Sequence, residues 1–268
     1  MKKFDLSGKV IIITGAANGI GQRCAYDLAA MGATIVATDI DVEGAKSTVE
    51  KIVTENGKAI SIKHDVTSEE DWSTVVNVCE QQFSRLDVLI NNAGIMMHIP
   101  FSICTYEDFK KQQVINVDSV FMGCKAACKL LAESGADGAG SSIINLSSVY
   151  GQIAGPMHSA YCASKGAVRM LSKSLATEFG RMGTKIRVNS VHPGPVNTEL
   201  GRGALSAAAK LGVIADEEQA YEAVGALFPM GRWGEAEDVA GVIAFLASDA
   251  SSFVTGAELV VDGGYSIV

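Results

Sequence analysis

The sequence predicts an α/β fold: a doubly wound parallel sheet of seven strands with helices on both faces, in a single domain that spans residues 1–268. Short β-branched runs alternate strictly with longer helical patterns along the chain. The runs are almost continuous in apolar residues, as expected for a parallel sheet that is covered on both faces. No repeat, low-complexity tract or Pro-rich linker divides the chain into two units.

Seven short runs rich in β-branched residues are the predicted strands. They occupy residues 9–14, 33–39, 58–65, 86–92, 141–147, 186–192 and 257–262. Patterns with apolar residues at helical spacing lie between them. These predicted helices occupy residues 19–31, 42–56, 68–84, 105–133, 159–182 and 236–248. The segment 198–230 differs, because glycines and Pro229 interrupt its helical stretches, and this favours an irregular, partly helical and mobile substrate cap.

The charge balance limits the partners of the protein. The formal net charge is −8 at pH 7. Nucleic acid or an anionic membrane requires a basic face that neutralises phosphate. We therefore expect a small-molecule substrate, with no nucleic-acid and no membrane partner.

The cysteines and the N-terminal segment favour a cytoplasmic location. Six cysteines form no C-x-x-C pair and no cluster with histidines at metal-ligand spacing, so we expect free thiols in a reducing compartment and no metal site. The apolar run 10–13 is too short for the core of a signal peptide or for a membrane span.

The stretch TGAANGIG, residues 14–21, joins the first predicted strand to the first predicted helix. Glycine allows a tight turn, and a phosphate can approach the amides at a helix N-terminus, where the dipole favours negative charge. A purely structural turn would also explain three glycines. Their place in a βαβ unit favours a dinucleotide-binding loop. Its contact residues are Gly15, Asn18, Gly19, Ile20 and Gly21.

A carboxylate ends the second predicted strand. Asp39 can accept hydrogen bonds from both hydroxyls of an adenosine ribose and would repel a 2′-phosphate. No lysine or arginine stands beside it in the sequence, where Ile40 and Asp41 follow. Asp39 could instead cap the following helix. After the glycine turn, the interpretation that we favour is a preference for NAD over NADP.

The stretch YCASK places a phenol and an ammonium four residues apart. In a helix, Tyr161 and Lys165 lie one turn apart on the same face. A neighbouring cation lowers the pKa of tyrosine from about 10, so the pair could act as a general acid and base. An amphipathic helix with a surface lysine is the alternative, and only the surrounding motifs decide between the two.

Further motifs follow in a fixed order. Asp65-Val66 comes after the third strand, N-N-A-G is residues 91–94, Asn116 lies in VINVDS, Ser148 lies in NLSS, and P-G-x-x-x-T is residues 193–198. With the glycine turn and the Y-x-x-x-K pair, they cover nearly the whole chain. The sequence resembles the short-chain dehydrogenase/reductase family of the common single-domain type. The resemblance implies a Rossmann-type, three-layer α/β/α fold and NAD(P)-dependent oxidation of a secondary alcohol or reduction of its ketone.

The resemblance also implies catalytic roles. Tyr161 would act as general base toward an alcohol and as general acid toward a ketone. Lys165 would lower the pKa of the tyrosine and bind the nicotinamide ribose, and Ser148 would hydrogen-bond the substrate oxygen. Asn116 would hold a water that links Lys165 to solvent. Spacing selects Ser148 over Ser147, although both could be turn residues, and Asn116 could be a polar helix residue bonded to backbone.

Matching positions imply further contacts with NAD. Asp65 and Val66 would meet the adenine, and residues 92–94 would follow the ribose and diphosphate. In the P-G-x-x-x-T segment, Val196 and Thr198 would bond the carboxamide. With Ile40, these residues are Asp65, Val66, Asn92, Ala93, Gly94, Pro193, Gly194, Val196 and Thr198.

The substrate pocket is expected to form from residues 94–100, 149–158 and 198–230. Their apolar residues are Ile95, Met96, Met97, Ile99, Tyr150, Ile153, Met157, Leu200, Leu205, Leu211, Val213 and Ile214. About half are expected to pack the cap instead. Only Arg202 and Lys210 carry positive charge there. This favours an uncharged, apolar alcohol, alicyclic or hydroxysteroid-like, over a charged substrate.

Other functions stay open. Within the family, 3-oxoacyl compounds, sugars or polyols are alternative substrates. A non-catalytic NAD-binding regulator would be expected to lose the tyrosine, lysine or serine. An epimerase or dehydratase for nucleotide sugars would have a longer segment after Pro193. Four histidines form no cluster in the sequence, and two of them, His98 and His158, are expected near the mouth of the site.

The predicted helices 105–133 and 159–182 carry more small and apolar residues than one sheet-facing stripe requires. These residues are Val117, Val120, Phe121, Ala126, Ala127, Ala163, Ala167, Leu171 and Leu175. In the family, these two helices form a four-helix contact between subunits, and the C-terminal strand forms a second contact. The resemblance therefore implies a homotetramer.

Overall fold

Seven parallel strands form one sheet in the order β3-β2-β1-β4-β5-β6-β7. The computed structural model describes residues 2–210, 212, 214–226 and 228–268. The strands are β1 (Val10–Thr14), β2 (Thr34–Asp39), β3 (Lys58–Lys63), β4 (Val88–Asn91), β5 (Ser141–Leu146), β6 (Ile186–Pro193) and β7 (Glu258–Val261). All seven lie on the predicted runs, and the predicted fold class is confirmed.

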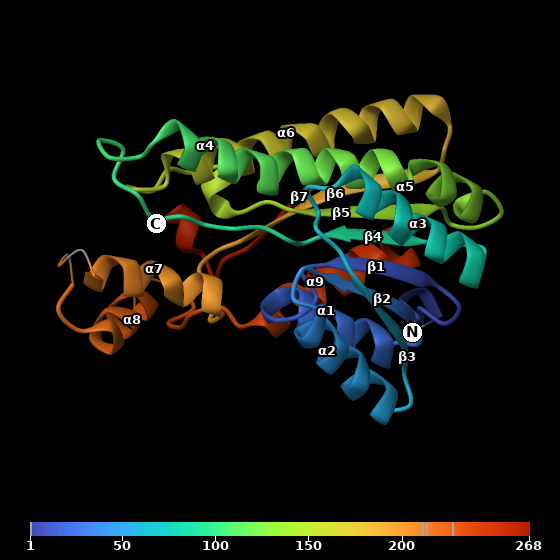
Figure 1. Cartoon of the computed structure of the whole chain (residues 1–268), viewed down its shortest axis with the longest axis horizontal. Helices are drawn as coiled ribbons and strands as arrows, with labels where there is room; N and C mark the ends of the chain where they lie inside the picture. The colour runs from blue at the N-terminus through green and yellow to red at the C-terminus, as the bar shows by residue number, and fades with distance from the viewer. Residues whose placement is uncertain (1, 211, 213, 227) are drawn as a thin grey trace.

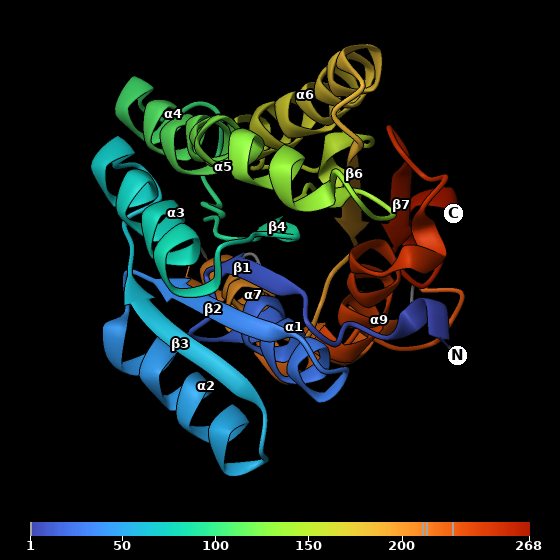
Figure 2. The same ribbon diagram turned by 90° about the vertical axis from the view of Figure 1, so that its right-hand side faces the viewer.

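Helices cover both faces of the sheet (Figures 1 and 2). One face carries α1 (Gly19–Ala30), α2 (Val42–Thr54) and α9 (Ala236–Ala247). The other carries α3 (Glu69–Phe83), α4 (Tyr106–Gln113), α5 (Ser119–Gly135) and α6 (Ser159–Met182). Short 3-10 turns complete the chain as η1 (Lys2–Phe4), η3 (Val149–Gly151), η4 (Asp249–Ser251) and η5 (Tyr265–Ile267).

Two predicted segments differ in detail from the structure. The helix predicted for 105–133 is interrupted between α4 and α5 by a π-helical segment, η2 (Val114–Asp118). The segment 198–230, expected to be irregular and only partly helical, contains two helices, α7 (Glu199–Lys210) and α8 (Glu217–Ala226). They lie together beyond the sheet (Figure 1). Their glycines did not prevent helix formation, because packing between helices can outweigh a propensity cost of about 1 kcal/mol per glycine.

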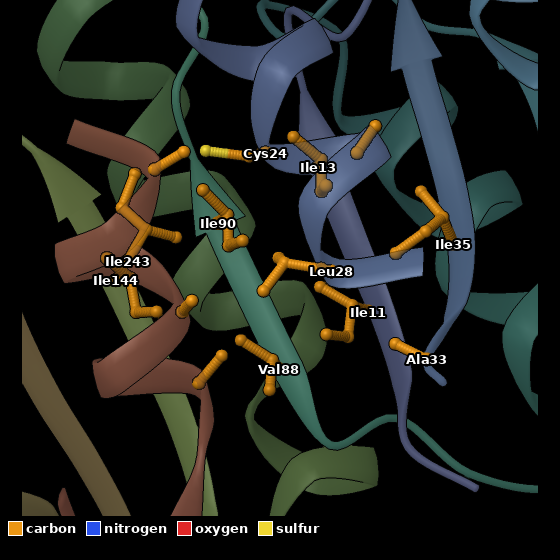
Figure 3. Packing of buried hydrophobic residues seen from close by; sticks show 14 of the residues in the cluster. Ile11, Ile13, Cys24, Leu28, Ala33, Ile35, Val88, Ile90, Ile144 and Ile243 are labelled. Atoms are coloured by element: carbon orange, nitrogen blue, oxygen red, sulfur yellow. The ribbon is translucent and has the colours of Figure 1, made fainter. Parts of the chain in front are cut away.

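A separate hydrophobic core lies on each face of the sheet. The core below α1 and α9 includes Ile11, Leu28, Ile90 and Ile243 (Figure 3). The core below α3, α5 and α6 includes Trp72. The central strands β1, β2 and β4 contribute alternate residues to the two cores, which explains why their sequences are largely apolar.

The strand order places the site. The chain proceeds outward from β1 toward β3, then returns to β4 on the other side of β1 and proceeds toward β7. Ligands of open α/β sheets bind at such a switch point, outside the carboxyl ends of the strands. In the described ranges, no helix combines the length and the apolar composition that crossing a membrane requires.

Candidate active site

A cavity of about 610 Å³ lies at the carboxyl ends of the strands and reaches from the β1 turn to α7 and α8. Most predicted site residues line it: Gly15, Asn18, Gly19, Ile20, Asp39, Ile40, Asp65, Val66, Asn92, Ala93, Gly94, Ser148, Tyr161, Lys165, Pro193, Gly194, Val196 and Thr198. Two predicted residues, Gly21 and Asn116, are not part of its lining.

The turn after β1 is built from glycines for two reasons. Gly15 and Gly19 have positive φ angles of 66° and 55°, which other residues rarely adopt. A Cβ on Gly21 would lie 2.0 Å from the carbonyl oxygen of Gly15, so this glycine permits close packing of α1 against the turn. Asn18, the N-cap of α1, makes no side-chain hydrogen bond to the helix. The first amides of α1 can therefore bind an anion.

The loop after β4 is tied to this turn. The Asn92 side chain donates to the carbonyl oxygens of Thr14 (2.9 Å) and Gly15 (3.0 Å). The Thr14 hydroxyl accepts from the amides of Asn92 and Ala93, both at 3.0 Å. These bonds fix the backbones of β1 and β4 relative to each other where the cavity begins.

Asp39 holds the turn from the side of β2. Its carboxylate accepts hydrogen bonds from the amides of Ala17 and Asp41, each at 2.9 Å. Asp39 does not cap the following helix, which was its alternative role. The N-cap of α2 is Asp41, whose side chain accepts a hydrogen bond from the amide of Gly44. The structure corrects one expectation: Lys63 is the register partner of Asp39 on β3, so a basic residue does stand next to it.

The next lining segment follows β3. The Asp65 carboxylate accepts from the amide (2.9 Å) and hydroxyl (2.7 Å) of Thr67, and these bonds lower its pKa. The indole of Trp72 donates to the carbonyl oxygen of Val66 at 2.9 Å. His64, which was not predicted to be in the site, also lines the cavity, and burial lowers its pKa to about 4. Its imidazole is therefore neutral at neutral pH.

Tyr161 and Lys165 lie one turn apart on α6, and both are buried in the cavity wall. The Lys165 Nζ lies 5.7 Å from the centre of the Tyr161 ring and donates to the carbonyl oxygen of Leu146 at 2.8 Å. Burial lowers the pKa of Lys165 to about 8. Burial also raises the pKa of Tyr161 to about 12, opposite to the shift predicted from the lysine, while the nearby Ser148 hydroxyl lowers it.

Ser148 and Ser147 have different surroundings. The Ser147 hydroxyl donates to the carbonyl oxygen of Lys165 at 2.8 Å and thereby supports α6. The Ser148 hydroxyl accepts from the amide of Tyr150 at 3.1 Å and lies near Tyr161. The same hydroxyl donates to the carbonyl oxygen of Pro193 at 3.5 Å, which is long for a hydrogen bond, so its proton can turn toward a substrate oxygen instead.

Asn116 lies in the π-helical segment and is buried. Its side chain accepts from the amide of Ile95 and donates to the carbonyl oxygen of the same residue, both at 2.9 Å. It also donates to the hydroxyl of Ser164 at 3.0 Å. Both polar atoms of the side chain thus bind protein groups, as in the alternative of a polar helix residue bonded to backbone. The water that Asn116 was predicted to hold, as a link between Lys165 and solvent, stays a prediction.

Gly94 lies against the catalytic candidates. A Cβ on this residue would lie 3.1 Å from Asn116 Oδ1 and 3.5 Å from Lys165 Nζ. The segment after β6 forms the opposite wall, where the Thr198 hydroxyl accepts from the amide of Gly201 at 3.2 Å. A bridge between Val196 and Gly234 fixes this segment near the start of α9.

The far end of the cavity is apolar and aromatic. Among the predicted substrate-pocket residues, Ile95, Met96, Tyr150, Leu200 and Leu205 line it. Met97, Ile99, Ile153, Met157 and Ile214 do not, and Leu211 and Val213 lie outside the described residues. His158, which was expected near the mouth of the site, lines it too, as do Val149, Gly201 and Val224 from the predicted segments and Pro195 from the P-G-x-x-x-T motif. The lining also includes residues that were not predicted to be in the site: Thr67, Ile115, Leu146, Ser147, Trp233 and Tyr265.

Charge in the cavity is sparse. Lys165 is the only lysine or arginine among the described lining residues. Arg202 does not line the cavity: its guanidinium donates to Asn197 at 2.7 Å and lies 4.5 Å from the centre of the Tyr221 ring. No group of three or more histidine, cysteine or acidic side chains within the described ranges could hold a metal ion. All six cysteines are free thiols.

Two of the four histidines do meet, contrary to the expectation of no cluster. The rings of His98 and His158 lie edge to face with centroids 4.5 Å apart. The ring of Tyr150 also lies close to that of His158, with centroids 4.8 Å apart. This contact could not be predicted, because the two histidines lie far apart in the sequence and their loops, after β4 and before α6, meet only in the folded chain. The Ile99 amide joins the two loops by donating to the carbonyl oxygen of Met157 at 3.0 Å.

Known proteins with similar sequences are oxidoreductases. The family model of enoyl-(acyl carrier protein) reductase matches residues 15–266. A D-threitol dehydrogenase of Mycolicibacterium smegmatis is 35% identical over 98% of this chain and 95% of its own length. A cyclopentanol dehydrogenase of Comamonas testosteroni is 36% identical (97% and 98%), and an NADP-dependent (R)-specific alcohol dehydrogenase of Lentilactobacillus kefiri is 37% identical (97% and 98%).

A similar solved structure is a short-chain type dehydrogenase/reductase from Mycobacterium marinum. Its TM-score is 0.87 at 33% identity, and the match covers 100% of this chain and 99% of that one.

Proposed function

Because this chain belongs to the short-chain dehydrogenase/reductase family and is an oxidoreductase of alcohols, we propose that it uses NAD to interconvert an uncharged, apolar secondary alcohol and its ketone. The observation that carries this proposal is the meeting of Tyr161, Lys165 and Ser148 in one cavity with the glycine turn and Asp39.

The residues of the β1 end fit a dinucleotide. The turn with its free amides at α1 would hold the diphosphate, and Asp39 would bind the adenosine ribose. Asp65 and Val66 line the cavity where the adenine would lie. When bound, the nicotinamide supplies the atom that accepts or gives the hydride. The NADP-dependent relative uses the other cofactor, but the carboxylate of Asp39 favours NAD here.

In this reaction, the side chains of the protein would transfer only the proton of the substrate hydroxyl. In alcohol oxidation, the Tyr161 oxygen would take the hydroxyl proton, and in ketone reduction it would return it. Ser148 would donate a hydrogen bond to the substrate oxygen, where negative charge develops. Because burial disfavours phenolate, Lys165 and the positive charge of the oxidised cofactor would have to offset this cost.

The lining supports the proposed substrate class. A carboxylate or phosphate substrate would require a basic group at the far end of the cavity, and no described lining residue there is a lysine or arginine. The cyclopentanol-oxidising relative agrees with an alicyclic substrate, whereas the threitol-oxidising relative keeps polyols as the second candidate. The helices α7 and α8, which contribute Leu205 and Val224, would form the cap.

A substrate screen tests the proposal. Purified protein would be assayed for NADH formation with cyclohexanol-type and steroid alcohols, polyols and 3-hydroxy acids, each with NAD⁺ and NADP⁺. We expect the highest kcat/KM with an apolar alcohol and NAD⁺. A clear preference for polyols would overturn the substrate class, and absence of turnover with every alcohol would favour a non-catalytic NAD-binding protein.

We also propose a homotetramer in the cytoplasm. Among the residues that prompted the prediction, Val120 and Ala127 are buried, and four more are partly buried against the core inside the subunit: Val117, Ala126, Leu171 and Leu175. Large apolar side chains nevertheless stay exposed on α5 and α6, namely Phe121, Met170 and Met182. The free thiols agree with a reducing compartment. A monomer mass in light scattering at micromolar concentration would contradict the tetramer.

A further inference from the structure

His158 occupies a special position in the cavity wall. It precedes α6, three residues before Tyr161, and its carbonyl oxygen accepts from the amide of Cys162 at 2.7 Å. Its side chain lines the cavity although only 7% of the residue is exposed. The rings of His158 and Tyr161 are 6.5 Å apart, so a group bound at His158 lies within a few bonds of the reacting carbon.

The tautomer of His158 is set by its contacts. Nδ1 lies 2.5 Å from the carbonyl oxygen of Pro156. A carbonyl oxygen only accepts, so Nδ1 must carry the proton and donate it. In a neutral imidazole, Nε2 is then an acceptor with a free lone pair. Burial also lowers the pKa of His158, which keeps the ring neutral.

Nε2 has no hydrogen-bond partner among the described residues, yet it is not sealed off. Both nitrogens of the neighbouring His98 are buried without a partner, but Nε2 of His158 does not belong to this group of inaccessible atoms. Nδ1 faces Pro156 and the side chain lines the cavity, so we infer that the Nε2 edge faces the cavity. The rings of His98 and Tyr150 pack against the imidazole and hold it in place.

We propose that His158 is a specificity-determining residue whose Nε2 accepts a hydrogen bond from a second hydroxyl of the substrate. The preferred substrate is then an alicyclic alcohol that carries a further hydroxyl near the reacting one. A carbonyl or ether at that place cannot donate and leaves Nε2 unpaired. This inference rests on the proposed function, because it assumes that an alcohol is oxidised beside Tyr161.

The test compares three substrates of one ring size. Cyclohexanol has no second polar group, cyclohexane-1,2-diol offers a donor, and 2-methoxycyclohexanol offers only an acceptor. For the unaltered protein, we expect kcat/KM for the diol to exceed that for the methoxy compound by roughly tenfold or more, because a site that binds a hydroxyl rejects the analogue that lacks it.

Variants identify the acceptor. His158→Leu should bring the diol-to-ether ratio close to one, and His158→Gln, whose amide oxygen can accept near the position of Nε2, should restore part of it. The matched control is His98→Leu, the same change on the adjacent imidazole that does not line the cavity, and it should keep the ratio. Binding of NADH, measured by fluorescence, reports whether each variant is folded.

The outcomes separate the two proposals. If neither a cyclohexanol derivative nor any other alcohol of the screen is oxidised with NAD⁺, the proposed function fails. If cyclohexanol is oxidised but the diol-to-ether ratio is near one in the unaltered protein, the assignment of His158 fails. Equal loss of the ratio in His98→Leu and His158→Leu would also overturn it, because packing rather than Nε2 would then set the preference.

Discussion

At the β1 end of the cavity the chain presents mainly backbone groups held by three strands, whereas at the α7 end it presents side chains from segments far apart in the sequence. The amides at α1 and the bonds from Asn92 to Thr14 and Gly15 depend on the sheet itself. Tyr150, Val224 and Trp233 come from separate loops and helices. We therefore expect that substitutions at the α7 end change substrate selectivity but leave cofactor binding at the β1 end unchanged.

The largest effect on turnover is expected from a substitution of Tyr161, which lies between the two ends of the cavity. Tyr161→Phe removes one hydroxyl and keeps the ring, so we expect kcat to fall by about 10²- to 10⁴-fold, the usual contribution of a general acid and base. NADH affinity and Tm should stay close to those of the unaltered protein. Tyr150→Phe is the control, since it makes the same change in the same cavity. Similar losses in both variants would mean that Tyr161 has no special role in proton transfer.

The pH dependence should separate chemistry from binding. Burial raises the pKa of Tyr161 to about 12, so the phenol is protonated at neutral pH and phenolate increases as the pH rises. We expect kcat/KM for alcohol oxidation to increase from neutral toward alkaline pH, by at most about tenfold per pH unit. The affinity for NADH should change little over this range. A rate that falls toward alkaline pH would argue against Tyr161 as the base.

A smaller effect is expected at the β2 corner of the cofactor end. Asp39→Ala should lower the ratio of kcat/KM with NAD⁺ to that with NADP⁺ by about tenfold, because it removes a like charge from the place of the 2′-phosphate. Lys63→Ala, which removes the opposite charge next to it, should raise the ratio. If the ratio moves in the same direction in both variants, charge at this corner does not set the preference.

The smallest effect is expected in the cap. Val224→Ala enlarges the α8 side of the cavity, and the lost contact should raise KM for an apolar alcohol by about three- to tenfold. KM for NAD⁺ should be unchanged, as measured by initial rates at saturating alcohol. A comparable rise in both KM values would show that the two ends of the cavity are not independent.

The two ends also differed in what could be predicted. All predicted contacts of the β1 end except Gly21 line the cavity, because a motif between a strand and a helix fixes its own position. Trp233 and Tyr265 were missed at the other end, since their places depend on how distant segments fold back. The neighbour Lys63 was missed for the same reason: strand register, not sequence distance, brings it to Asp39.

Within the fold, the strands were easier to predict than the interruptions of helices. Apolar runs such as 9–14 reveal buried strands directly. The π-helical segment at 114–118 has no such signal, and its Asn116 binds the backbone of Ile95 in another loop, a contact that forms only in the folded chain. The rise in the pKa of Tyr161 could not be foreseen either, since burial is its largest cause and burial is a tertiary property.

The π-helical turn of η2 (Val114–Asp118) should tolerate the loss of one residue during evolution. A π-helical turn contains more residues than an α-helical one, and each residue added to a regular helix rotates the remainder of that helix by about 100°. Loss of one residue there could be absorbed by closing the turn, so that α5 keeps its orientation on the sheet. The same loss between Tyr161 and Lys165, in the uninterrupted α6, would rotate the lysine away from the tyrosine. Length variation among descendants of this chain should therefore accumulate near Asn116 and be eliminated from the start of α6.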